Sequence, residues 1–295
     1  MPAGRDTTGT EQQDMPALFD TSVPHIARVY NYWLGGKDHF AADRDLAERF
    51  IAADPEVIAG VRANRAFLGR AVHFLAAEAR IRQFLDIGTG IPTTNNTHEV
   101  AQRAAPDSRI VYVDNDPIVL AHARALLTSD PAGATDYIDA DLRNTGAILA
   151  QAARTLDFGR PVAVMLMGIL QCIPDEDDPR AIVAALMDGV PPGSYLAISH
   201  PASDVHAEAR AGAALLNEGL ATPVTFRTRA AIARFFDGLE LVEPGVRSCG
   251  RRRPSWPGAW CRRPRPNATA GWRPAPARPA RGRRRTGRWR RGCGR

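Results

Sequence analysis

The stretch that decides the fold is FLDIGTGIPTTNNTHEVAQ, residues 84–102. A short apolar run over 82–87 predicts a buried strand, and Gly88 and Gly90 follow it directly. A helix is predicted from about Thr94 to Arg103, with Pro92 just ahead of its first turn. This order of strand, glycine turn and helix is typical of the first unit of a doubly wound α/β sheet.

The same alternation continues along the chain. Further strands are predicted over 109–113, 136–140, 162–167 and 195–199, with one more beginning at Leu239, and helices over 118–127, 179–187, 204–219 and 228–236. The run over 162–167 is nearly all apolar, as expected of a strand that is covered on both faces. The pattern predicts a Rossmann-like α/β domain over residues 81–246.

Helices are predicted ahead of this domain. Residues 1–17 are polar and predicted to be disordered, and residues 18–80 are predicted to form a helical cap. The pair Gly35-Gly36 interrupts the first helix, and a long amphipathic helix is predicted over 56–79.

Aromatic, amide and charged side chains crowd around that glycine break, from Tyr30 to Asp38. One interpretation is a lid over a ligand crevice, with Lys37 or Arg65 pairing a ligand carboxylate. The alternative is a helix-turn-helix that packs on the sheet and leaves its charges in solvent.

The last 49 residues, 247–295, differ sharply from the rest. They hold 17 of the 38 basic residues, no acidic ones, and no Leu, Ile, Val, Met, Phe or Tyr, which leaves 21 basic and 32 acidic side chains in residues 1–246. We predict a disordered tail without strands or amphipathic helices, and hence a sheet that lacks its last strand.

Two explanations of the tail remain open. Its composition of Arg, Pro, Gly, Ala and Trp suggests a GC-rich coding region read in a shifted frame from about residues 245–248. The alternative is a basic arm that binds nucleic acid or another polyanion without specificity. The cysteines show neither zinc-ligand spacing nor a disulfide framework, so no metal is expected.

Acidic residues follow three of the predicted parallel strands. Asp86 ends the first, Asp114 and Asn115 end or follow the second, and Asp141 and Leu142 follow the third. Ligands of such sheets bind at the carboxyl ends of the strands, where a carboxylate can accept the hydroxyls of a ribose. Asp139 could replace Asp141 if the register of the third strand differs by two residues.

The glycine pattern argues against an anionic ligand at the first turn. A dinucleotide pyrophosphate wants G-x-G-x-x-G with open amides, but here Thr93 replaces the third glycine and Pro92 lacks an amide hydrogen. Asp86 lies close to the turn, and a carboxylate suits a cationic ligand such as the amino group or sulfonium of S-adenosylmethionine. A nicotinamide oxidoreductase is therefore the weaker alternative.

Four motifs together resemble the class I S-adenosylmethionine-dependent methyltransferases: the stretch quoted above, VYVDNDP (111–117), DADLRN (139–144) and GILQCIPDEDDP (168–179). More narrowly, IARVYNYWLGGKDHFAADR (26–44), ANRAFLGRAV (63–72) and PPGSYLAISH (191–200) resemble an actinobacterial branch called the S-adenosyl methyltransferase family, formerly a domain of unknown function. The similarity covers roughly residues 18–246.

The resemblance implies roles for single residues. It places Asp86, Gly88, Thr89 and Gly90 around the methionine moiety, and Asp114 with Asn115 at the ribose. It places Asp141 and Leu142 at the adenine, and Met167 beside the transferred methyl group.

The resemblance also implies the activity. We expect a cytoplasmic methyltransferase that uses S-adenosylmethionine on a small-molecule acceptor, without a membrane segment and without specific nucleic-acid binding. His200, after the fifth strand, is a weak candidate for a general base, and local hydrogen bonding is its plainer role. The alternative function is a non-catalytic cofactor-binding protein inactivated by its altered C-terminus.

Overall fold

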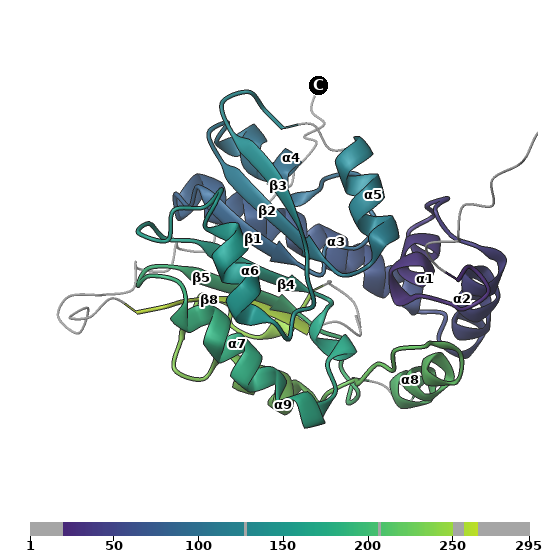
Figure 1. Cartoon of the computed structure of the whole chain (residues 1–295). Coiled ribbons are helices and arrows are strands. Elements are labelled where there is room, and N and C mark those ends of the chain that lie inside the picture. The colour runs from purple at the N-terminus through teal and green to yellow at the C-terminus, as the bar shows by residue number, and fades with distance from the viewer. Residues whose placement is uncertain (1–19, 127–128, 206–207, 250–256, 265–295) are drawn as a thin grey trace, which may run out of the picture. The chain divides into compact units, whose positions relative to one another are not determined.

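An eight-stranded sheet forms the centre of the computed structural model (Figure 1). The structure describes residues 20–126, 129–205, 208–249 and 257–264. They belong to one compact unit, which ends at Pro264. The strand order is β3-β2-β1-β4-β5-β8-β6, and β7 pairs with β8. No described helix has the length and apolar character that a membrane span requires.

Five strands run parallel: β1 (Gln83–Ile87), β2 (Arg109–Asp114), β3 (Ala134–Asp139), β4 (Ala163–Met167) and β5 (Tyr195–Ser199). β1 pairs with β2 on one side and with β4 on the other, so the strand order reverses there. A reversal in strand order opens a crevice at the carboxyl ends of the two strands concerned. The predicted Rossmann-like fold is confirmed.

Helices cover both faces of the sheet. They are α3 (Val57–His73), α4 (Thr97–Ala104), α5 (Pro117–Leu126), α6 (Thr145–Ala152), α7 (Pro179–Asp188) and α9 (Arg229–Ala233). Phe84 packs with α3 and α4 on one face, and its neighbour Leu85 packs with α6, α7 and α9 on the other. This alternation explains why β1 is buried along its whole length.

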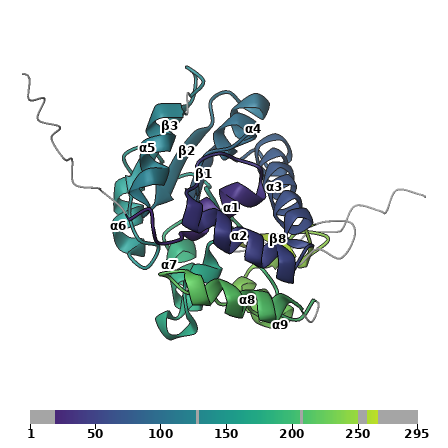
Figure 2. The same cartoon turned by 90° about the vertical axis from the view of Figure 1, so that its right-hand side faces the viewer.

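A cap of three helices lies over one end of the sheet (Figure 2). Its members are α1 (Ile26–Trp33), α2 (Ala41–Ala53) and α8 (Glu208–Gly219), and Val29, Leu46 and Leu216 share its apolar core. A buried ion pair of 2.9 Å between Arg28 and Asp43 joins α1 to α2. The helical break is confirmed between α1 and α2, but α8 was not predicted to belong to the cap.

Two local predictions need correction. α4 begins at Thr97 rather than at Thr94, because Asn96 caps it and its backbone N–H donates to Glu99 at 3.2 Å. Pro92 therefore lies outside the first turn. The helix α6 was missed, since its eight residues are mostly small or apolar and carry no amphipathic pattern.

The prediction that the tail has no strand is wrong. β8 (Pro257–Arg262) lies antiparallel between β5 and β6 (Glu240–Leu241), and β7 (Arg247–Ser248) also pairs with it. The sheet thus has its last strand, and the compact unit extends past the predicted boundary at residue 246. The predictions for residues 1–17 and for 265–295 lie outside the described residues, and the frame shift stays a prediction.

Small side chains explain how this segment forms a strand without aliphatic residues. Ala259 and Cys261 are buried in the apolar core on one face of the sheet. Trp260 points to the other face, with its ring 5.4 Å from that of Phe67 and 5.7 Å from that of Phe74. Backbone pairing with β5 and β6 supplies the rest.

A pair of truncations tests the role of β8. A chain that ends at Val246 exposes the edge of β5 and removes the Trp260 contacts, so we expect aggregation and loss of cooperative thermal unfolding. A chain that ends at Pro264 keeps β8 and should unfold like the full chain. Calorimetry and size-exclusion chromatography measure both, and a cooperative, monodisperse protein ending at Val246 would contradict the structural role.

Candidate functional site

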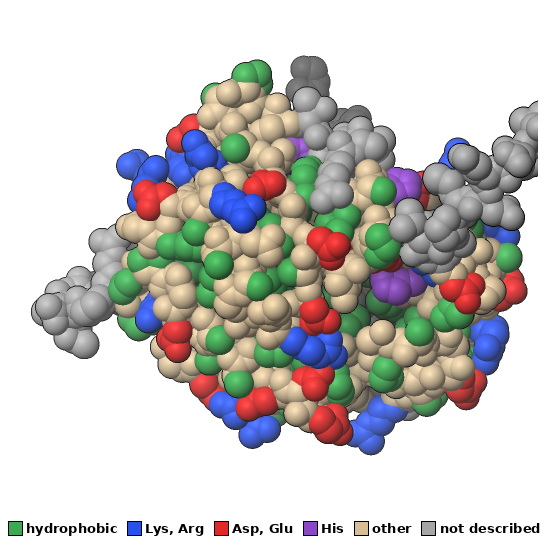
Figure 3. Space-filling view, viewed as in Figure 1, with side chains coloured by type: hydrophobic (Ala, Val, Ile, Leu, Met, Phe, Trp, Pro, Cys, Tyr) green, Lys and Arg blue, Asp and Glu red, His purple; other side chains and the backbone are tan. Residues whose placement is uncertain are grey.

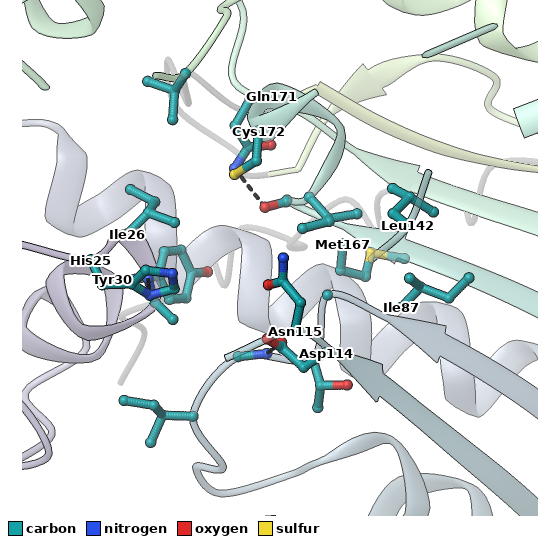
Figure 4. Close-up of a pocket in the computed structure, with 18 of the residues that line it drawn as sticks. His25, Ile26, Tyr30, Ile87, Asp114, Asn115, Leu142, Met167, Gln171 and Cys172 are labelled. Atoms are coloured by element: carbon teal, nitrogen blue, oxygen red, sulfur yellow. Dashed lines mark hydrogen bonds between the residues drawn. The ribbon is translucent and has the colours of Figure 1, made fainter. Parts of the chain in front are cut away.

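A cavity of about 280 Å³ opens at the carboxyl ends of β1, β2 and β4, below the cap (Figure 4). Sheet residues line one side, and residues of α1, α8 and the segment 222–226 line the other. Of the predicted site residues, the cavity brings together Asp86, Gly88, Thr89, Gly90, Asp114, Asn115, Asp141, Leu142, Met167 and Arg65.

The turn after β1 depends on its two glycines. Gly88 and Gly90 have φ of +73° and +65°, a region that side chains disfavour. A Cβ on Gly88 would collide with the side chain of Ile169, whereas a Cβ on Gly90 would meet open space. The turn therefore packs tightly on one side and leaves the backbone at Gly90 accessible.

Asp86 lies at the cavity wall but is only 4% exposed. Its Oδ2 accepts a hydrogen bond of 2.5 Å from the Thr97 hydroxyl at the start of α4. Burial raises the pKa of Asp86 to about 6. The charge of Arg65 partly offsets this rise in pKa, but no described residue forms an ion pair with Asp86, so a cationic ligand group would stabilise the ionised carboxylate.

Asp114 ties the second strand to the glycine turn. Its Oδ2 accepts the Gly90 N–H at 2.9 Å, and its Oδ1 accepts the Asp116 N–H at 3.0 Å. Burial raises the pKa of Asp114 above its ordinary value. Each carboxylate oxygen can accept a second hydrogen bond, which leaves capacity for ligand hydroxyls.

The neighbours of Asp114 link the sheet to the cap. Asp116 caps the start of α5, since its Oδ1 accepts the Ile118 N–H at 2.8 Å. The Oδ2 of Asp116 lies 3.0 Å from Nδ1 of His25, which stands at the start of α1 and lines the cavity. We did not predict His25 as a cavity residue, because nothing in the sequence brings residue 25 next to residue 116.

The register after β3 is resolved in favour of Asp141. Asp139 is the last residue of β3 and is exposed, whereas Asp141 and the buried Leu142 line the cavity. Arg143 holds the Asp141 carboxylate, with Nη1 at 3.0 Å from Oδ2, and pairs with Asp177 at 2.6 Å.

Arg65 and Lys37, the two predicted partners of a ligand carboxylate, have different outcomes. Arg65 lines the cavity and donates to the carbonyl oxygens of Thr94 and Asn95 at 3.1 and 3.3 Å. Lys37 is exposed and does not line the cavity, because the turn after α1 carries it outward. The structure therefore does not bring Lys37 to the cavity, although residues of α1 line it.

His200 does not reach the cavity as a base. It is fully buried, its Nδ1 donates to the Pro201 carbonyl at 2.7 Å, and its Nε2 accepts from Arg227 at 3.0 Å. Burial lowers the pKa of His200 to about 3, so the ring stays neutral. Local hydrogen bonding, its plainer role, is what the structure shows.

The wall chemistry fits a nucleoside with cationic groups. Asp86, Asp114 and Asp141 face one cavity, and burial raises the pKa of the first two. Of the arginines that line the cavity, Arg143 is already paired with two carboxylates. A pyrophosphate would meet three carboxylates and only two described arginines, Arg65 and Arg143, whereas an amino or sulfonium group would be stabilised.

Solved structures of similar sequence have the same fold. A DUF574 family protein from Streptomyces avermitilis MA-4680 is 43% identical with a TM-score of 0.80, over 83% of this chain and 99% of its own. A putative methyltransferase from Thermobifida fusca YX is 40% identical with a TM-score of 0.77, over 83% and 97% of the two chains.

Magnesium protoporphyrin IX methyltransferase from Synechocystis PCC 6803, solved with bound SAH, is a more distant match. It is 13% identical with a TM-score of 0.50, over 80% of this chain and 93% of its own, and so shares the fold alone. No curated protein matches the sequence.

The family model for S-adenosyl methyltransferases matches residues 12–271. The matched range includes the cap, all five parallel strands and β8. It also runs past residues 245–248, where a frame shift was suspected. The chain belongs to the S-adenosyl methyltransferase family.

Proposed function

We propose that this enzyme transfers the methyl group of S-adenosylmethionine to a small-molecule acceptor inside the cavity below the cap. As a member of its family, the chain is an S-adenosylmethionine-dependent methyltransferase. The observation that supports the site is one cavity lined by Asp86, Asp114 and Asp141, in which these carboxylates outnumber the described arginines Arg65 and Arg143.

The proposed roles follow the chemistry of each wall. Asp86 would hold the cationic amino group of the methionine moiety, and Asp114 would accept the ribose hydroxyls. Asp141 would accept from the adenine amino group, with Leu142 against its ring. Arg65 would pair the methionine carboxylate.

When bound, the cofactor supplies an electrophilic methyl group on a positively charged sulfur. The acceptor's lone pair would form the new bond to that carbon as the electrons of the C–S bond stay on sulfur, and the methylated product would give its proton to bulk solvent when it leaves the cavity. The residues of this chain contribute alignment and exclusion of water, which can supply much of the rate of such a displacement. No catalytic residue is assigned.

Two observations support a small acceptor over a nucleic acid. The cavity lies between the strand ends and helices of the cap, and its volume of about 280 Å³ suits a small molecule. On the face in Figure 3, acidic and basic side chains are interspersed, without the continuous basic surface that phosphate backbones need. The non-catalytic alternative rested on a missing strand, and β8 occupies that place.

The cytoplasm is the proposed location. The described cysteines Cys172, Cys249 and Cys261 are all free thiols, as expected in a reducing compartment. The similar structures from Streptomyces and Thermobifida support an actinobacterial origin.

Alanine variants at the ends of β2 and β3 test the cofactor site. Asp114→Ala and Asp141→Ala should each weaken S-adenosylmethionine binding about tenfold or more, because each removes a charged hydrogen-bond acceptor. Asp139→Ala is the matched control, since Asp139 pairs in register with Asp114 but is exposed and outside the cavity. Titration calorimetry measures all three. Parental affinity in Asp114→Ala would refute the ribose role.

The pH dependence of binding tests Asp86. Its pKa of about 6 lies above the ordinary 3.8, so the free protein binds a proton there below about pH 6. A cationic ligand binds the ionised form, and its affinity should therefore fall up to about tenfold per pH unit below pH 6 and level off above it. In Asp86→Asn the affinity should be lower at neutral pH and depend less on pH. A parental affinity that is constant from about pH 5 to 7 would contradict the role.

A further inference from the structure

Two buried side-chain amides on the cavity wall each leave one oxygen without a partner. Gln171 is 4% exposed and Asn64 is 3% exposed, and both line the cavity. Among the described residues, none donates a hydrogen bond to Oε1 of Gln171 or to Oδ1 of Asn64. A buried carbonyl oxygen without a donor costs free energy. Each oxygen can therefore accept a hydrogen bond from a ligand group.

The hydrogen-bond partners of both amides show which atom of each amide group has no partner. The Nε2 of Gln171 donates to the Gly168 carbonyl at 2.5 Å, so this end must be the nitrogen (Figure 4). The Nδ2 of Asn64 donates to the Tyr30 hydroxyl at 2.9 Å, and that hydroxyl donates onward to the Val61 carbonyl at 3.3 Å. The unpaired atoms are thus oxygens, and they select a hydrogen-bond donor over an acceptor.

Hydrogen bonds to the backbone of Gln171 and of its neighbours fix the position of this residue. Its backbone carbonyl accepts the Thr225 N–H at 2.7 Å, which ties it to the cavity segment 222–226. The buried Arg227 donates to the carbonyls of Leu170 at 2.8 Å and Ile173 at 2.7 Å, on either side of Gln171. A polar group held in this way loses little entropy when it binds a ligand.

The cap side of the cavity carries a group of apolar side chains beside the polar His25, Asn31 and Thr222. Side chains of α1, α8 and the segment 222–226 provide this apolar group: Ile26, Leu34, Leu216, Val224 and Phe226. Arg143 is paired with carboxylates, and Arg65 is assigned to the methionine carboxylate. Among the described cavity residues, no further Arg or Lys is left to pair an anionic acceptor.

We propose that the methyl acceptor is a largely apolar small molecule with an N–H or O–H group, and that this group donates to Oε1 of Gln171. Asn64 offers a second acceptor, and the apolar part of the molecule lies against the cap. The proposal rests on the proposed function. The lone pair of that same nitrogen or oxygen forms the bond to the methyl carbon while the C–S electrons stay on sulfur. The amide of Gln171 orients the donor, and the methylated product gives its proton to bulk solvent when it leaves the cavity.

Matched probes test the proposal on the full chain saturated with S-adenosylhomocysteine, which prevents turnover. The donors are 4-methylaniline and p-cresol, and their partners without a donor are N,N-dimethyl-4-methylaniline and 4-methylanisole. We expect at least one donor to bind about tenfold tighter than its partner, measured by saturation-transfer NMR and calorimetry. The ratio of the two affinities is compared between the probe pairs. A larger ratio for the aniline pair indicates an amine acceptor, and a larger ratio for the p-cresol pair indicates a hydroxyl acceptor.

Variants test whether Oε1 of Gln171 causes the preference for probes that carry a hydrogen-bond donor. Gln171→Met should lose it and keep the parental affinity for S-adenosylmethionine. Gln171→Glu should retain it in its protonated form, which can donate to the Gly168 carbonyl through one oxygen and accept through the other. Gln102→Met is the control, because Gln102 is a buried amide outside the cavity whose Oε1 and Nε2 are both paired.

Three results would overturn the proposal while cofactor binding stands. One is that neither donor binds better than its partner, and another is that Gln171→Met keeps the preference. The third is that Gln171→Met weakens the binding of S-adenosylmethionine but not that of the probes, which would mean that Oε1 of Gln171 binds the cofactor. If the parental chain binds no S-adenosylmethionine, the proposed function itself fails.

Discussion

The parallel pairing of β1 with β2 and β4 is the constraint on which the site depends. Asp86 is in register with Tyr112 and with Met165, so the segments that follow the three strands emerge at one edge. The hydrogen bond from the Gly90 N–H to Asp114 then joins two of these segments at 2.9 Å. Residues far apart in sequence share one cavity because of this register.

Electrostatics explains why such a cavity suits its cofactor. Burying carboxylates without cations costs free energy, and the raised pKa values of Asp86 and Asp114 express that cost. A ligand that carries positive charge offsets this free-energy cost, whereas a phosphate would increase it. The two unpaired amide oxygens, on Asn64 and Gln171, extend the same principle from charge to hydrogen bonding.

The sequence predicted the parallel strands and the site edge, because apolar runs that end in Asp or Gly are local signals. It could not choose between Asp139 and Asp141, since a shift of two residues keeps the same face of a strand. The contact of α8 with α2 and the outward path of Lys37 depend on long-range packing. β8 escaped prediction because its partners, rather than its own composition, stabilise it.

The place of β8 also has a consequence for biosynthesis. Of the described strands it is the last to leave the ribosome, yet it lies between β5 and β6, which are made earlier. Until β8 is made, the sheet therefore ends at β5, because β6 joins the sheet only by pairing with β8. Until then the edge of β5 can pair with other chains, so the newly made protein depends on rapid completion or on chaperones to stay unaggregated.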